Sequence, residues 1–211
     1  MTKISEIMRM KRRRTGLAIS LVVLILIISC DKDTGINFFT LSQDIEFGET
    51  MDSIIRANPA DYPILDPASN TNAYSFINSM MQDILQSDDF VHKADFDWEI
   101  TIIDDDVMNA FAVPGGKLYF YTGLIKYLDN AADLAGVMAH EMAHADRRHS
   151  TEQMTKQYGL SALIALLLGD DKSQLETIAS DLATGLAALQ FSRKHEYEAD
   201  EYAIRFTADT E

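Results

Sequence analysis

Residues 140–144 read His-Glu-Met-Ala-His, two histidines four residues apart with a glutamate directly after the first. On an α-helix, residues i and i+4 lie one above the other on the same face, so His140 and His144 can direct imidazole nitrogens at one metal ion. Glu141 is then close enough to take a proton from a metal-bound water without binding the metal itself. Two nitrogen ligands, a general base and an open coordination position are what a zinc site needs to hydrolyse a peptide bond.

The residues around this motif are typical of a helix with one buried side. Asn130 is a favourable N-cap, and Asp133, three residues later, completes a start that resembles a capping box. No proline occurs between residues 131 and 148, and the apolar residues follow a helical period: Leu134, Val137, Met138, Met142 and Ala145. We therefore predict a helix over residues 131–148 that carries the motif, in preference to a chance pentapeptide.

A tetrahedral zinc site that keeps one position for water needs a third protein ligand. His149 is nearest in sequence but, five residues after His144, it faces another direction on a helix. The longer motif with a third histidine six residues after the second is absent, because Ser150 occupies that position. The only other histidines are His92 and His195. The third ligand must therefore come from another segment.

A later segment contains a pair of carboxylates suited to this task. Ser192 can cap a helix, and Glu196 and Asp200 then lie at i and i+4 on one face. We expect Glu196 to bind the zinc and Asp200 to accept the outer N–H of a ligand histidine, which fixes its tautomer. An acidic, exposed helix is the alternative, which the histidine motif disfavours. Glu198 lies on a different face, where we expect a solvated charge, and His195 is rotated about 100° from Glu196 and is a poor ligand candidate.

Three blocks of the chain resemble the zinc metallopeptidases of peptidase family M48, which include the CAAX prenyl proteases, HtpX and the bacterial envelope proteases BepA and LoiP. The blocks are residues 109–116 with 121–124, residues 134–149, and Ser192-Arg193 with Glu196, Ala199 and Asp200. The resemblance spans roughly residues 41–206. It favours the bacterial lipoprotein branch, because the prenyl proteases span the membrane many times and this chain has no such set of apolar segments.

The resemblance implies the fold and the site. We expect an α+β, zincin-like (gluzincin) domain that is mostly helical, with a small three-stranded sheet edging the active-site cleft. One Zn²⁺ per chain would be bound by His140, His144 and Glu196. In the family, the residue matching Glu196 is the third ligand and the residue matching Asp200 supports the site.

Four residues of a predicted strand, Asn109, Ala110, Phe111 and Ala112, are candidates for substrate binding. Peptidases often bind the substrate as an added strand, because main-chain hydrogen bonds do not depend on sequence. The resemblance implies that this strand edges the cleft and that Asn109 faces the substrate backbone. The alternative is an ordinary sheet strand in which Asn109 satisfies its own turn.

The remaining elements follow from periodicity and turn residues. We predict helices over residues 41–56 and 73–86, a proline-containing loop over 58–72, and strands over 98–103, 107–113 and 117–121, with Pro114-Gly115-Gly116 as a turn. Asp104-Asp105-Asp106 is expected to be a solvated turn and not a calcium site. Residues 160–168 are apolar but too few to span a bilayer, which favours a buried helix; a membrane-dipping or cleft-covering flap is the alternative.

The first 29 residues have the pattern of a secretory signal. Four basic residues at 11–14 precede an apolar run over 17–28 that only Ser20 interrupts. Ser29 before Cys30, at the end of that run, resembles the bacterial lipobox, which implies cleavage after Ser29 and lipidation of Cys30. The alternative is an uncleaved anchor with an incidental cysteine. Cys30 is the only cysteine of the chain, so it forms no internal disulfide.

The charge of the chain excludes one class of partner. Cleavage would remove six basic residues and one acidic residue, so the formal net charge of −15 would become −20. Such a surface repels nucleic acid and anionic lipid. We therefore expect polypeptide substrates, a membrane contact through the lipid anchor, envelope-protein partners and no nucleic acid.

These observations predict a signal peptide over residues 1–29, a tether over 30–40 and a metallopeptidase domain over 41–211, which stops within its last predicted helix. The predicted function is zinc-dependent endopeptidase activity in the bacterial cell envelope, with the protein facing the periplasm or the outside and acting on misfolded or unassembled envelope proteins. The alternative is a lipoprotein with a latent site that acts as a chaperone-like or scaffold subunit. The intact Glu141 favours catalysis, because a retired enzyme needs no general base.

Overall fold

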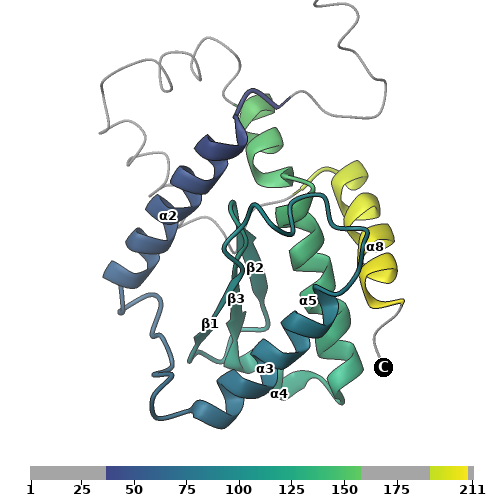
Figure 1. The fold of residues 1–211 in the computed structure, drawn as a ribbon. Coiled ribbons are helices and arrows are strands. Elements are labelled where there is room, and N and C mark those ends of the chain that lie inside the picture. The colour runs from purple at the N-terminus through teal and green to yellow at the C-terminus, as the bar shows by residue number, and fades with distance from the viewer. Residues whose placement is uncertain (1–36, 158–190, 209–211) are drawn as a thin grey trace, which may run out of the picture. The chain divides into compact units, whose positions relative to one another are not determined.

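A small mixed sheet lies between helices in this protein, as the computed structural model of residues 37–157 and 191–208 shows (Figure 1). Strand β1 (Glu99–Ile103) runs parallel to β3 (Lys117–Tyr121), and β2 (Ala110–Val113) runs antiparallel to β3. The spatial order is β1-β3-β2, so β1 and β2 are the two edges.

The two edges of the sheet differ in what covers them. Residues 63–65 run along the outer side of β1, where the Leu65 N–H donates to the carbonyl of Ile102 and the Asp104 N–H donates to that of Pro63. No strand pairs with the outer side of β2 in the part of the chain that the structure describes. Among the described residues, the outer side of β2 therefore has no β-strand partner, whereas that of β1 has one short partner segment.

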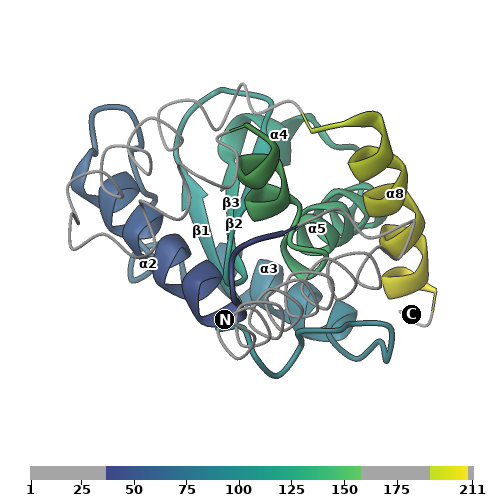
Figure 2. The same cartoon turned by 90° about the horizontal axis from the view of Figure 1, so that it is seen from above.

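Helices cover both faces of the sheet, and Figure 2 shows the same order from above. Helix α2 (Leu41–Ala57) lies on one face, and α3 (Thr71–Ile84) and α5 (Ala131–Asp146) lie on the other. Helix α8 (Arg193–Thr207) packs along α5 on the side away from the sheet, and the short α4 (Thr122–Tyr127) follows β3 directly.

Alternation along the strands produces two apolar cores. Ile102 and Phe120 point to the side of α3 and α5, whereas Ile103, Phe111 and Tyr119 point to the side of α2. Helix α2 presents Phe47, Met51 and Ile55 to the second core at helical spacing.

The turn between β2 and β3 requires glycine. Gly115 and Gly116 have φ of 84° and 91°, which side chains with a Cβ rarely adopt. Gly48 of α2 packs against this turn, and a Cβ on it would lie 1.8 Å from the carbonyl oxygen of Pro114. The helix and the turn are therefore in direct backbone contact.

The mostly helical fold with a small three-stranded sheet is confirmed, and the predicted elements differ mainly in their bounds. Strands β1 and β2 begin later than predicted, β3 has the predicted bounds, and α4 was not predicted. The helix predicted over residues 131–148 ends at Asp146, and residues 149–157 form a new helical segment. Within the described residues, no helix is both long and apolar enough to cross a membrane. Cys30 and residues 160–168 lie outside the described part of the chain.

Candidate active site

Helix α5 begins as its sequence predicts and directs the histidine motif toward α8. The Asn130 side chain accepts a hydrogen bond from the Asp133 N–H at 3.0 Å, which satisfies one of the free donors at the helix start. Met138 and Met142 are fully buried in the core on the sheet side. The face that carries His140 and His144 is thereby turned to α8.

Three predicted ligands converge at this contact. The Nε2 atoms of His140 and His144 are 3.0 Å apart. Glu196 of α8 places one carboxylate oxygen 3.5 Å from His140 Nε2 and the other 3.9 Å from His144 Nε2. Among the described residues, these three form the only group of histidine, cysteine and acidic side chains close enough to hold one metal ion.

The spacing of the donor atoms fits zinc. Ligands about 2.0–2.1 Å from a tetrahedral ion lie about 3.4 Å from each other, and the three observed distances bracket that value. Two imidazoles and one carboxylate are a donor set that zinc accepts, and a fourth position remains for water or substrate. No further residue needs to move into the site to complete it.

The outer nitrogen of His140 contacts the carboxylate of Asp200. Asp200 lies one turn after Glu196 on α8, and its Oδ1 is 3.0 Å from His140 Nδ1. Its side chain is 66% exposed. Donation from Nδ1–H to Asp200 would leave the Nε2 lone pair directed at the metal position.

The outer nitrogen of His144 contacts another histidine. His149 Nδ1 lies 3.0 Å from His144 Nδ1, so the expectation that His149 faces away from the site is wrong. The reason is the end of α5: Arg148 adopts φ of 60°, in the left-handed region, and turns the chain back beneath His144. The guanidinium of Arg148 donates to Asp44 of α2 and to the carbonyl of Phe39, which holds the turn.

The expectation of a solvated charge at Glu198 is also wrong. Arg147 Nε donates to Glu198 Oε1 at 2.9 Å, and the side chains of both residues are mostly buried. The other oxygen of Glu198 lies 3.6 Å from His149 Nε2. Glu198 faces this pair because α5 ends where Arg147 can reach across to α8, which helix periodicity alone does not indicate. His195, rated a poor ligand candidate, is not part of the metal-binding group.

The ring of His144 is also held by Phe191, which precedes the cap of α8. The two ring centroids are 4.1 Å apart and nearly parallel. Burial, together with the neighbouring histidines, lowers the pKa of His144 to about 2, and burial and His195 lower that of His149 to about 4. Both rings are therefore neutral at neutral pH, as a metal ligand must be. The sequence carried no signal for the role of Phe191.

Glu141 follows His140 on α5, and its carboxyl group lies near Glu196 and the backbone of Ala112 on β2. Burial, followed by the nearby charge of Glu196, raises its pKa to about 8, and a hydrogen bond from the backbone N–H of Ala112 opposes that shift. A bound cation would also favour the carboxylate form. The backbone N–H of Ala112 on β2 is therefore near the predicted general base.

The four residues proposed to bind substrate differ in the face of the sheet to which they point. Ala110 and Ala112 pack in the core that includes α5, and their small side chains allow the helix and the strand to approach each other. Phe111 packs against Tyr119 on the opposite face, with ring centroids 4.7 Å apart. Its side chain is therefore not available to a substrate on the α5 side. Asn109 is half-buried at the start of the strand, and its carbonyl accepts from the N–H of Tyr121.

A family model described as Peptidase family M48 matches residues 71–211, which include α3, the sheet, the histidine motif and α8. The chain belongs to peptidase family M48. This membership confirms the resemblance inferred from the sequence and the expected class of zinc metalloendopeptidase.

Individual relatives share about half of the chain. The mitochondrial metalloendopeptidase OMA1 of Arabidopsis thaliana is 34% identical over 113 residues, covering 52% of this chain and 22% of the relative. OMA1 of Schizosaccharomyces pombe is 38% identical over 109 residues, covering 51% and 32%. The beta-barrel assembly-enhancing protease of Escherichia coli is 32% identical over 113 residues, covering 49% and 23%. The chain thus spans about a fifth to a third of the length of these curated relatives.

Proposed function

We propose that this protein is a zinc-dependent endopeptidase of the bacterial cell envelope. The observation that carries the proposal is the convergence of His140, His144 and Glu196 beside Glu141. A zinc ion bound there would supply a Lewis acid and lower the pKa of a bound water. The family membership supports the same chemistry.

Residues of the chain would carry out the proton transfer and bind the substrate. The carboxylate of Glu141 accepts a proton from the attacking water and later returns it to the amine that leaves. The outer edge of β2 binds the substrate as an added strand through the main-chain groups of Ala110, and the side chain of Asn109 faces the substrate backbone, so that the peptide passes beside Glu141. A substrate bound in this way is extended, which favours unfolded or unassembled polypeptides over compact ones.

The experiment compares Glu141→Gln with the wild type. The variant should retain zinc, because Glu141 is not a ligand, and its cleavage of casein should fall by about 10²–10⁴-fold or more. Glu201→Gln is the matched control, since Glu201 lies on the exposed face of α8 and pairs only with Arg205 among the described residues. Equal cleavage by the wild type and Glu141→Gln would favour the alternative function, a latent site in a chaperone-like or scaffold subunit.

The substrate class and location form a finer part of the proposal. The printed name of the E. coli relative refers to beta-barrel assembly, which supports misfolded or unassembled envelope proteins as substrates. Lipidation of Cys30 after cleavage at residue 29 would hold the domain at the membrane, facing the periplasm or the outside. Radiolabelled palmitate should enter the wild type and not Cys30→Ser, and the variant should retain the signal segment. Absence of label from both would overturn the lipoprotein assignment.

A further inference from the structure

The two ligand histidines are supported by different partners. His140 uses a carboxylate, Asp200. Histidine ligands of zinc generally donate their second N–H to a carboxylate, a backbone carbonyl or water. His144 instead has the imidazole of His149 at 3.0 Å from its outer nitrogen, so this partner has to act as the acceptor.

The position of the metal determines which nitrogen carries each proton. The Nε2 of His144 faces Glu196 and His140, so this nitrogen must be unprotonated when it binds zinc, and the proton of the neutral ring lies on Nδ1. The Nδ1–H then donates to the Nδ1 of His149. A neutral His149 that accepts at Nδ1 carries its own proton on Nε2.

That second proton points toward an anion. Glu198 Oε2 lies 3.6 Å from His149 Nε2, slightly longer than a hydrogen bond. The Glu198 carboxylate is fixed from its other side by Arg147 at 2.9 Å, and the guanidinium of Arg147 stacks 4.5 Å from the ring centre of Tyr202. The acceptor for His149 is therefore held in place by Arg147, the residue that follows α5, which itself packs on Tyr202 of α8.

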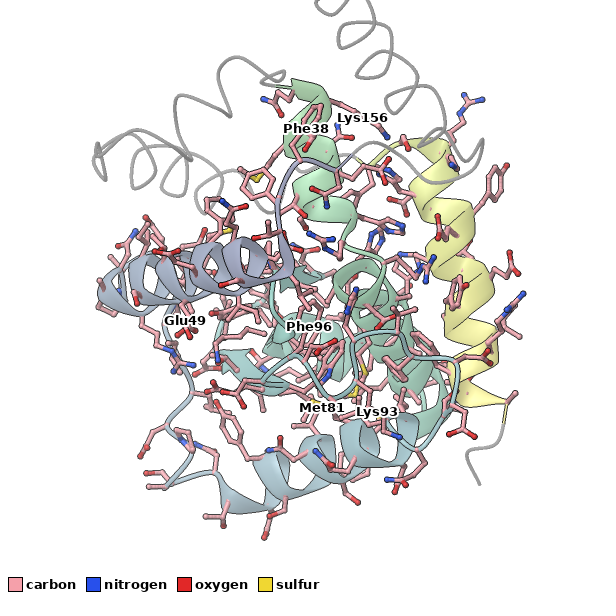
Figure 3. All side chains as sticks on the ribbon, turned by 45° about the horizontal axis from the view of Figure 1, so that its top comes forward. Phe38, Glu49, Met81, Lys93, Phe96 and Lys156 are labelled. Atoms are coloured by element: carbon pink, nitrogen blue, oxygen red, sulfur yellow. The ribbon has the colours of Figure 1, made fainter. Side chains whose placement is uncertain are left out.

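The ring of His149 also has little freedom to turn. Its side chain is 1% exposed, and the ring of His195 stacks on it with centroids 4.5 Å apart and planes 11° apart. His195 is fixed in turn, because its Nε2 lies 3.0 Å from Glu152 Oε1 and 3.1 Å from Nζ of Lys156, which Figure 3 labels on the helical segment of residues 149–157.

We propose that His149 is a positioning residue for the zinc site, which fixes the tautomer and the orientation of His144 and is itself held by Glu198 and Arg147. This inference rests on the proposed zinc site and deepens it. On the buried side of the site, His149 would orient His144 as Asp200 would orient His140 on the exposed side. His149 does not touch the substrate or the metal.

The test measures zinc affinity of the purified full chain by competition with a chromophoric chelator. His149→Leu fills the space but removes the acceptor, and its dissociation constant for zinc should rise by about 10–100-fold. His149→Asn places an amide oxygen close to where Nδ1 was, and its affinity should return to within about threefold of the wild type. Glu198→Ala should give a loss smaller than that of His149→Leu.

His195→Phe is the matched control, because His195 is as buried as His149 and makes no hydrogen bond to His144, and a phenyl ring keeps the stack on His149. It should retain most of the zinc affinity. Equal affinities of the wild type and His149→Leu would overturn the inference. Equal losses in the Leu and Asn variants of His149, or an equal loss in His195→Phe, would also overturn it, because packing alone would then explain the effect.

A second measurement concerns the tautomer directly. The chain has five histidines, so ¹⁵N-labelled rings can be assigned by substitution in the zinc-loaded protein. His149 should carry its proton on Nε2 and His144 on Nδ1. A proton on Nδ1 of His149 would overturn the inference. Neither measurement uses peptide cleavage, so a chain that binds zinc but does not cleave casein would refute the proposed activity and leave the role of His149 to be decided separately.

Discussion

The two halves of the candidate zinc site are built in different ways. The His140 side reaches solvent through its partner: Asp200 is 66% exposed, and His140 itself is partly buried at 22% exposure. The His144 side is part of the core, with His144 at 3% exposure and His149 at 1%. The two histidine ligands on α5 thus have different partners, a solvated carboxylate for His140 and a buried imidazole for His144.

Because of this difference, the two sides should contribute differently to zinc affinity and to the stability of the fold. A charge partner in water is screened and contributes little to the free energy of unfolding, so the exposed side can be optimised for the metal. Buried polar groups are costly unless they are paired, so the contacts on the buried side must form as the protein folds. We therefore expect substitutions on the buried side to affect both stability and zinc affinity, and those on the exposed side to affect mainly affinity.

The largest expected effect separates the two ligands. His140→Ala and His144→Ala should both lose zinc at stoichiometric concentrations, because each removes one of three ligands. In the metal-free state, His144→Ala should lower the free energy of unfolding by about 2–4 kcal/mol, as for other large buried side chains. His140→Ala should lower it by less than about 1 kcal/mol. Urea titration with a chelator present measures the free energy of unfolding of both variants. Equal losses of stability would contradict the expected difference between the exposed and the buried side.

The second prediction concerns removal of the metal. Zinc at 100 times its dissociation constant should stabilise the wild type by about 2.7 kcal/mol, which thermal melts with and without a chelator would measure. Amide hydrogen exchange should locate the change. On removal of zinc, exchange should accelerate in α8 around Glu196 and Asp200 more than in the core-facing turns of α5. Uniform acceleration through both helices would indicate that the two sides unfold as one unit.

The smallest effect is expected from Asp200. Asp200→Ala should weaken zinc binding by about 10-fold, at the lower end of the range for such partners, because its carboxylate is solvated. The melting temperature of the metal-free protein should not change measurably. Higher salt should reduce the difference in affinity between the variant and the wild type, because salt screens exposed charges. A loss of metal-free stability would show that the exposed side also supports the fold.

The sequence predicted the exposed side of the site better than the buried side. His140, His144, Glu196 and Asp200 follow from helical spacing within two continuous helices, and the structure brings all four side chains together. Periodicity is a local rule, and it holds as long as the helix continues. It also supports the strands and most helices, whose bounds shifted by a few residues.

The contacts that the sequence did not predict occur where α5 ends and helical periodicity no longer applies. His149 faces the site only because Arg148 leaves the helical conformation, and Arg148 does so where Asp44, buried in α2, can pair with it. Asp44 and Arg148 are 104 positions apart in the sequence. The pairing of Glu198 with Arg147 is likewise a contact between helices. Periodicity within a single helix cannot predict either contact, because each contact joins residues that are far apart in the sequence.

The order of the ligands along the chain also bears on how a cell makes this protein. His140 and Asp200 are 60 positions apart, and the histidine motif is made before α8. At about 5–20 residues per second, a ribosome takes about 3–12 seconds to cover that distance. Until Glu196 has been made, the nascent chain has two of the three metal ligands and lacks the carboxylate, so it cannot assemble the complete three-ligand site.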